Sequence, residues 1–198
     1  MTTSSAPAAS NLRFANGTAA LGPGTYDFDP VHTFVGFKAR HLIVGSVGGR
    51  FNDVRGTILV GEAVGEAKIE AVVSAASIDT MNAARDDDLK GEHFLDAARF
   101  PTLTYRSTRI EHAGGGEWSI LGTLSVRDIE RPVVLALSFL GAIVDPSGRT
   151  RAGFTATAHI RRAEFGISWE LLKELGPVAA GPDIAIHIEA EAVLREQT

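Results

Sequence analysis

The residues best suited to chemistry gather in one short segment, RDDDLKGEHFLDAARFP, from Arg85 to Pro101. Five carboxylates, a histidine and two arginines fall within its seventeen residues. Such carboxylates can act as general acids or bases, or as ligands of a hard cation. They also suit the solvated first turn of a helix, where the dipole favours negative charge. We favour the helix interpretation, because Asp86, Asp87 and Asp88 stand together at a predicted helix start.

The histidines do not form a recognisable catalytic or metal-binding pattern. There are six of them and no cysteine, and no HExxH or HxH spacing is present. His32 and His41 flank one predicted strand but have opposite parity, which places them on opposite faces. No serine stands in a G-x-S-x-G elbow, and no phosphate-binding glycine loop is present. The sequence therefore predicts no metal, no cofactor and no catalytic nucleophile.

Composition narrows the classes of partner. The 198 residues carry 24 acids and 19 bases, a net charge of -5, with no basic stripe, so nucleic acid is not expected to bind. No run of eighteen apolar residues predicts a membrane-spanning helix. Residues 1–24 are rich in Ala, Ser, Thr and Gly and are interpreted as a flexible tail without a secretion signal. Residues 25–198 are expected to form one domain.

From Thr25 onward, short runs alternate between apolar and polar residues, which is the period of β-strands. Most links between the runs are short and glycine-rich, which favours antiparallel neighbours. Eight strands leave open edges unless the sheet closes, so we expect an all-β, eight-stranded antiparallel barrel. The predicted strands cover residues 32–42, 51–60, 68–73, 103–110, 118–126, 132–144, 153–162 and 183–193.

Two segments interrupt the strand pattern. The first is the acidic segment, where Leu89, Phe94 and Leu95 form the apolar side of a short helix between the third and fourth strands, which Pro101 cannot continue. The second covers residues 165–182, before the last strand, where Trp169 and two leucines recur at helical spacing. Both are expected to be short helical excursions from the barrel.

Parity along the strands predicts which residues face the barrel interior. An eight-stranded barrel either fills with side chains or holds one small ligand. Small residues at inward positions favour an open cavity. These small residues are Ala39, Gly56, Ala71, Gly122, Ala156 and Ala158. The large residues predicted to face inward are Val35, Phe37, Phe51, Ile58, Val73, Leu103, Tyr105, Leu124, Leu135, Leu137, Phe139, Phe154, Ile186 and Ile188.

Five sequence blocks, in order, resemble the YceI-like, polyisoprenoid-binding proteins from about Tyr26 to Val193. They are YDFDPVHTFVGFKARHLIVGSVGGRF, RDDDLKGEHFLDAARFPTLTYRST, LGTLSVRDIERPVVLALSF, GFTATAHIRRAEFGI and DIAIHIEAEAV. The resemblance implies an extended, lipocalin-like barrel whose long apolar pore holds a long-chain amphiphilic lipid, such as an isoprenoid quinone, a polyprenyl compound or a similar amphiphile. It also implies a binder or carrier, not an enzyme, and favours a homodimer. Because no secretion signal is recognised, a cytoplasmic location is expected.

The resemblance can be carried over to single positions. Family motif positions fall on Asp29 to His32, Gly49 to Phe51, Arg85, Asp86, Phe94, Pro101, Arg161 and Phe165 to Ile167. Two positions depart from the family pattern. Asp88 replaces a histidine, which removes any head-group role carried over for that residue, and Asp128 replaces a glycine in a hairpin.

The sequence and the resemblance together give a set of candidate binding residues. The candidates for an apolar cavity are Val35, Phe37, Phe51, Ile58, Val73, Leu89, Phe94, Leu95, Leu103, Tyr105, Leu124, Leu135, Leu137, Phe139, Phe154, Phe165, Trp169 and Ile186. The candidates for a polar head group are His41, Arg85, Asp86 and Arg161, with Tyr105 as a further donor. Arg85 and Asp86 are also expected to pair with each other or with strand residues as a structural clamp.

Two other functions remain open. A small barrel enzyme, such as a cyclase or hydrolase acting on an apolar substrate, would use His41 or His93 as a general base. An interaction module would have a solidly packed barrel without a cavity.

Overall fold

Alternating apolar and polar residues build long strands over most of the chain. The computed structural model describes residues 12–15, 18–41, 45–167 and 180–196. The strands are β1 (Leu12–Ala15), β2 (Thr18–Leu21), β3 (Gly24–Phe28), β4 (Phe34–His41), β5 (Gly45–Phe51), β6 (Val54–Val60), β7 (Lys68–Ser74), β8 (Ile78–Asp79), β9 (Thr102–Gly114), β10 (Glu117–Val126), β11 (Ile129–Val144), β12 (Thr150–Arg161) and β13 (Ala180–Leu194). The helical elements are η1 (Val64–Glu66), η2 (Ala75–Ser77), α1 (Ala83–Lys90) and η3 (Arg162–Phe165).

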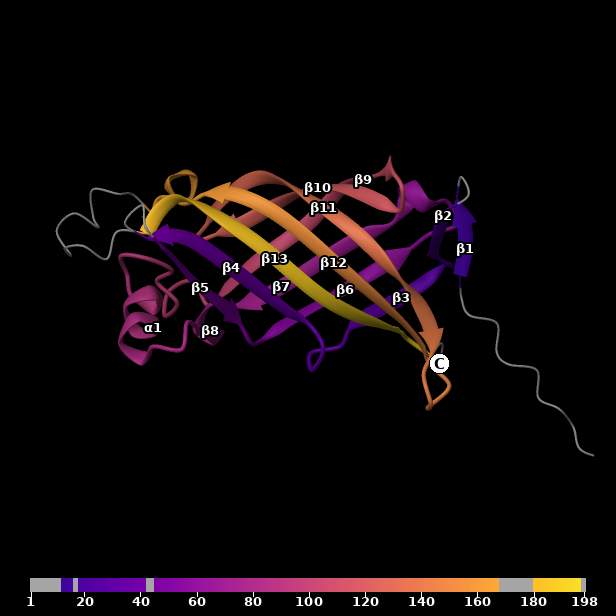
Figure 1. The fold of residues 1–198 in the computed structure, drawn as a ribbon, viewed down its shortest axis with the longest axis horizontal. Helices are drawn as coiled ribbons and strands as arrows, with labels where there is room; N and C mark the ends of the chain where they lie inside the picture. The colour runs from indigo at the N-terminus through magenta and orange to yellow at the C-terminus, as the bar shows by residue number, and fades with distance from the viewer. Residues whose placement is uncertain (1–11, 16–17, 42–44, 168–179, 197–198) are drawn as a thin grey trace, which may run out of the picture.

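Eight of these strands close into a barrel. The hydrogen-bonded order is β12, β11, β10, β9, β7, β6, β3 and β13, and β13 pairs again with β12 to complete the ring. All these pairings are antiparallel. The barrel is elongated, with α1 and β8 at one end and the β1–β2 hairpin at the other (Figure 1). The predicted all-β, eight-stranded antiparallel barrel with a short helical excursion is confirmed.

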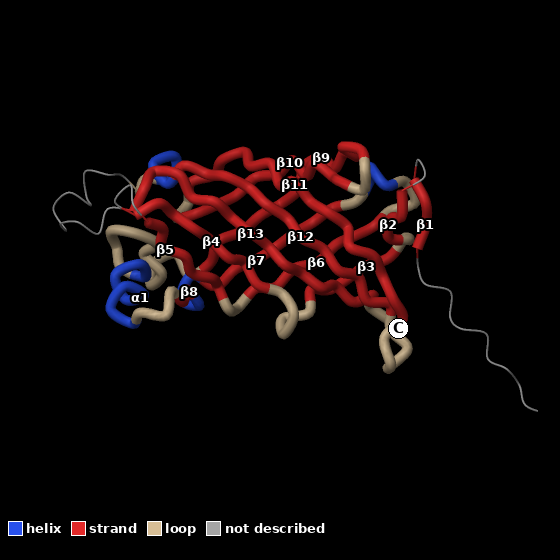
Figure 2. The backbone as a smooth tube through the Cα atoms, viewed as in Figure 1, coloured by secondary structure: helices blue, strands red, loops and turns tan. Residues whose placement is uncertain are grey.

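The strand β13 changes its partner halfway along its length. Its last residues pair with β3 at Phe28, whereas residues from Ile184 to Glu189 pair with β4. β4 continues the sheet to β5, and β5 pairs with β8 through only two residue pairs. The end of the barrel beyond β8 is therefore bordered by α1 and the turns that follow it, instead of by another full strand (Figure 2).

The N-terminal segment differs from the prediction of a flexible tail over residues 1–24. β1 and β2 pair as an antiparallel hairpin, and β3 begins at Gly24. Ala20 and Leu21 are each only 7% exposed and belong to the main core. The apolar content of this segment is low, but Ala20 and Leu21 reach the core of the barrel, which buries them.

The helix α1 is shorter than the apolar pattern suggested. Asn82 caps its start by accepting a hydrogen bond from the Arg85 amide, and the Gly91 amide donates to the Asp88 carbonyl at its end. Phe94 and Leu95 lie beyond the helix, in turns. The Phe94 amide donates a hydrogen bond to the Gly91 carbonyl, and the Leu95 amide donates one to the Leu89 carbonyl. The second predicted helix, which includes Trp169, falls largely on residues 168–179, outside the described residues.

None of the described helices has the length and apolar character needed to cross a membrane.

The middle of the barrel is packed, not open. A Cβ added to Gly122 would lie 2.5 Å from the Tyr105 hydroxyl oxygen, and one added to Gly56 would lie 2.6 Å from Cε2 of Phe28. The two aromatic rings therefore lie directly over these glycines. The expectation that the small residues leave empty space is wrong at these two positions, because the absent side chains are replaced by rings from neighbouring strands.

Candidate functional site

A large apolar chamber of about 340 Å³ lies at the α1 end of the barrel. β4, β5, β7, β9, β10, β12 and β13 contribute its walls, and α1 with its following turns contributes Leu89, Phe94 and Leu95. The polar side chains among its lining residues are Arg85, Asp88, Thr104, Tyr105 and Arg162. The alternative of a solidly packed barrel, which an interaction module would have, therefore does not hold at this end.

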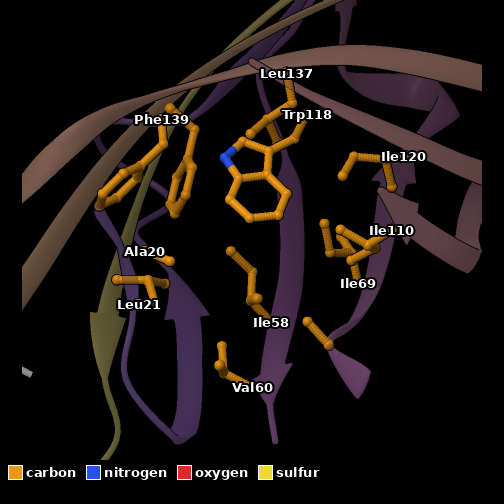
Figure 3. Close-up of a pocket in the computed structure, with 12 residues that line it drawn as sticks. Ala20, Leu21, Ile58, Val60, Ile69, Ile110, Trp118, Ile120, Leu137 and Phe139 are labelled. Atoms are coloured by element: carbon orange, nitrogen blue, oxygen red, sulfur yellow. The ribbon is translucent and has the colours of Figure 1, made fainter. Parts of the chain in front are cut away.

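A second, smaller chamber of about 80 Å³ lies at the β1–β2 end. Trp118 and Phe139 stand on one side of it, and Ile58, Val60 and Leu21 face them across the space (Figure 3). This chamber shares no lining residue with the large one.

The candidate cavity residues divide between the two chambers. The large chamber is lined by Val35, Phe37, Phe51, Val73, Leu89, Phe94, Leu95, Leu103, Tyr105, Leu124, Phe165 and Ile186. The small chamber is lined by Ile58, Leu137, Phe139 and Phe154. Leu135 lines neither chamber and is buried in the core between them, and Trp169 lies outside the described residues. The interior therefore holds two separate spaces and not one continuous pore.

The most unusual residue of the large chamber is Arg162, which the sequence analysis missed. It is only 5% exposed and stands in the chamber wall beside Ile160 and Phe165. Burial lowers the pKa of its guanidinium below the ordinary value. Parity gave the signal that could have found it, because Ile160 and Arg162 are two residues apart and share the inward face.

Arg161, the predicted head-group residue, lies on the opposite face. Its side chain is 72% exposed and lies 3.6 Å from a carboxylate oxygen of Asp183 on β13. It does not line the chamber. The side chain that reaches the interior is that of Arg162, the next residue along the chain.

Arg85 and Asp86 meet at Thr80 and not at each other. The amide and hydroxyl of Thr80 donate to Oδ1 of Asp86, at 2.8 and 2.6 Å. Nε and Nη2 of Arg85 donate to the hydroxyl and carbonyl oxygens of Thr80, at 2.8 and 2.9 Å. The predicted clamp therefore runs through the residue that follows β8. Asp86 is buried within it and does not line the chamber, whereas Arg85 does.

The motif at Gly49 to Phe51 forms the other half of this attachment. A Cβ on Gly49 would lie 2.7 Å from both Phe37 and the methyl group of Thr80. Phe51 is buried in the core cluster that Leu89 and Leu95 cover. Two motifs that are far apart in the sequence thus fix α1 against β5.

Replacing Asp86 with alanine is expected to lower the free energy of unfolding by about 1–3 kcal/mol, because the amide and hydroxyl of Thr80 lose their buried acceptor. Asp87→Ala provides the matched control, since Asp87 is an exposed neighbour on the same helix. Its loss should stay within about 0.5 kcal/mol. Urea denaturation of both variants makes the comparison, and equal losses would show that the Thr80 clamp contributes nothing.

The remaining polar candidates have other surroundings. The Tyr105 hydroxyl donates to the Ile120 carbonyl at 2.9 Å and lies 3.3 Å from the Val133 carbonyl, so its single proton is already engaged. His93 is half exposed, lies 3.8 Å from Glu92 and does not line the chamber. His41 ends β4, where its backbone pairs with Gly45 and Ala180, and its side chain lies outside the described part of the structure.

The Asp-Pro-x-His motif belongs to a different cluster, at the break between β3 and β4. One ligand atom each from Asp29, His32 and Glu191 lies within 4.8 Å of the others, which is a spacing that a metal ion could occupy. Nη1 of Arg151 already hydrogen bonds to both carboxylates, so the cluster contains its own cation. The Asp29 amide and the Thr33 hydroxyl also donate to the Glu191 carbonyl. The motif therefore fastens the point where β13 changes partner.

The pKa of Asp29 reflects these contacts. Burial alone would raise it, but hydrogen bonds from Arg151, His32 and the Val31 amide outweigh burial and hold the pKa well below its ordinary value of 3.8. Asp29 is therefore ionised at every pH where the barrel is expected to work.

Comparison with known proteins agrees with this architecture. A UPF0312 protein of Azotobacter vinelandii is 35% identical over 183 residues, covering 88% of this chain and 93% of that protein. A UPF0312 protein of Yersinia pestis is 32% identical over 183 residues, covering 92% of this chain and 93% of that protein.

Solved structures share the fold. BcnA of Burkholderia cenocepacia matches with a TM-score of 0.72 at 17% identity, over 83% of this chain and 98% of that one. A YceI protein of Campylobacter jejuni matches with a TM-score of 0.67 at 26% identity, over 79% and 90%. A polyisoprenoid binding domain from Saccharophagus degradans matches with a TM-score of 0.68 at 14% identity, over 86% and 98%.

The family model described as the YceI-like domain matches residues 26–192, nearly the whole barrel. The chain therefore belongs to the YceI-like family, as the resemblance of its five sequence blocks predicted.

Proposed function

We propose that this protein binds an amphiphilic lipid, with the apolar chain in the large chamber. The observation that carries the proposal is the chamber itself, a space of about 340 Å³ with walls built almost entirely from aliphatic and aromatic side chains. Ligand pockets in proteins commonly measure about 300–1,000 Å³ and combine apolar walls with a few polar groups. The chamber fits this description at the small end of the range.

Hydrophobic transfer provides the binding free energy. Each methylene-sized group moved from water into an apolar wall contributes about 0.8 kcal/mol before the cost of ordering the chain. A branched prenyl chain suits a chamber lined by branched side chains and phenyl rings. An isoprenoid alcohol, phosphate or quinone is therefore the ligand class we propose. The structural similarity to the polyisoprenoid binding domain from Saccharophagus degradans supports the same ligand class.

The polar end of the ligand is assigned to Arg162, with Arg85 nearby in the lining. Arg162 lines the chamber and is only 5% exposed, and a charge-assisted hydrogen bond to an anionic or strongly polar ligand group is stronger there than in water. Asp88 and Leu89 follow Arg85 by about one helical turn, and all three residues line the chamber from α1. Among the charged side chains that line the chamber there are two arginines and one aspartate, so the balance favours an anion.

Native mass spectrometry of the purified protein, before and after incubation with farnesol or farnesyl phosphate, tests the proposal. We expect one added ligand mass per chain, and the same spectra show whether the protein forms the homodimer that we also propose. Ile186→Trp fills the chamber from β13 and should abolish uptake, whereas Val72→Trp, on the exposed face of β7, should not. No uptake by the wild-type protein, or equal uptake by both variants, would refute binding in the chamber.

A further inference from the structure

The packed layer between the two chambers has a repeating pattern along the strands. On β10, Trp118 and Ile120 line the small chamber, Leu124 and Val126 line the large one, and Gly122 between them lines neither. β7 repeats this order with Ile69, Ala71 and Val73.

β12 has the same order, from Phe154 through Ala156 and Ala158 to Ile160. On these three strands small residues therefore line the interior at one level, and larger side chains from other strands fill the space there.

Two aromatic residues lie across glycines at this level. Tyr105 lies across Gly122, and its hydroxyl is fixed by a 2.9 Å hydrogen bond to the Ile120 carbonyl. Phe28, the last residue of β3, lies across Gly56. It packs against both hydrophobic clusters, including the cluster of Phe51, Val54 and Ile78 beside the large chamber. The Tyr105 ring is thus held by a hydrogen bond, and the Phe28 ring is held by its packing against the two clusters.

We infer that Phe28 and Tyr105 form a floor that limits the length of the prenyl chain the large chamber accepts. This inference rests on the proposed lipid binding and adds a chain-length limit to it. A chain that enters beside α1 reaches the two rings after filling about 340 Å³, and the 80 Å³ beyond them is closed to it. The protein therefore selects short prenyl amphiphiles over long ones.

Removing one ring should join the chambers. Phe28→Ala deletes the ring over Gly56 and opens a path towards Ile58, on the small-chamber side. Phe139→Ala is the matched control: the same chemical change in the same core, at a residue that lines only the small chamber. It enlarges the small chamber and leaves the floor in place.

Isothermal titration with geraniol, farnesol and geranylgeraniol, which contain two, three and four isoprene units, tests the floor. Wild-type protein and Phe139→Ala should bind geranylgeraniol no more tightly than farnesol. Phe28→Ala should bind geranylgeraniol roughly tenfold more tightly than farnesol, because additional apolar groups then find a pocket. Should Phe28→Ala fail to fold, Phe28→Leu shortens the ring with a smaller loss of packing and should shift the preference in the same direction.

The outcomes separate the two proposals. If no alcohol binds to any folded variant, the proposed lipid binding is wrong. If the wild-type protein binds the three alcohols with affinity that rises to the longest, lipid binding stands and the floor does not. The floor is also refuted if Phe28→Ala and Phe139→Ala show the same chain-length preference.

Discussion

Replacing Arg162 with methionine is expected to weaken binding of farnesyl phosphate about a hundredfold and to leave binding of farnesol almost unchanged. The guanidinium lies in the apolar wall, 5% exposed, where a charge-assisted hydrogen bond to phosphate is stronger than in water. A hundredfold loss corresponds to about 2.7 kcal/mol, which falls within the range for hydrogen bonds between charged groups. Competition titrations with the two ligands measure the difference.

Arg161→Met is the matched control for this prediction. Arg161 is the adjacent arginine, but its side chain is 72% exposed and paired with Asp183 outside the chamber. It should leave both affinities unchanged. If Arg161→Met weakens phosphate binding and Arg162→Met does not, the head group lies outside the barrel and the assignment of Arg162 is wrong.

The second large effect is expected at the β3–β4 break, where Arg151→Met should lower the free energy of unfolding by about 3 kcal/mol at neutral pH. Nη1 of Arg151 bonds to Asp29 and Glu191, and its Nη2 lies 3.6 Å from Asp145. The side chain is only 19% exposed. Without it, three carboxylates remain close together at the point where β13 exchanges β3 for β4. The control is Arg55→Met, whose exposed pair with Asp53 should contribute little.

The pH dependence of this loss follows from the pKa of Asp29. Because the folded pKa lies below the ordinary value of 3.8, the carboxylate stabilises the fold above about pH 4, and this contribution disappears as the pH falls further. The variant loses the part of this contribution that Arg151 provides, while the hydrogen bonds from His32 and the Val31 amide remain. The stability difference should therefore be largest at neutral pH and decrease below about pH 4. A difference that stays constant down to pH 2 would contradict the role given to Arg151.

Much of the barrel could be predicted from the sequence, because strand parity is a local property. Val54, Ile58 and Val60 are buried on one face of β6 as their alternation indicated, while Arg55 and Leu59 are exposed. The same rule, continued from Ile160 to the first residue after β12, would have placed Arg162 inside and Arg161 outside. That error came from giving a motif position more weight than parity.

The divided interior could not be predicted in this way. Parity shows that Gly56, Gly122 and Tyr105 face inward, but not the direction in which a ring leans after it leaves its strand. Tyr105 leans across β10, and Phe28 across β6, because glycines there leave room. The clamp at Thr80 was also hidden, since it joins Arg85 and Asp86 through a residue with no motif of its own.

A crystal structure of the protein with farnesyl phosphate tests lipid binding in the barrel most directly. We predict a single ligand in the chamber beside α1, with its phosphate within hydrogen-bond distance of Arg162 and its chain between Leu124, Phe165 and Ile186. A ligand found on the outer surface of the barrel, or an empty chamber in crystals grown at saturating ligand, would contradict the account.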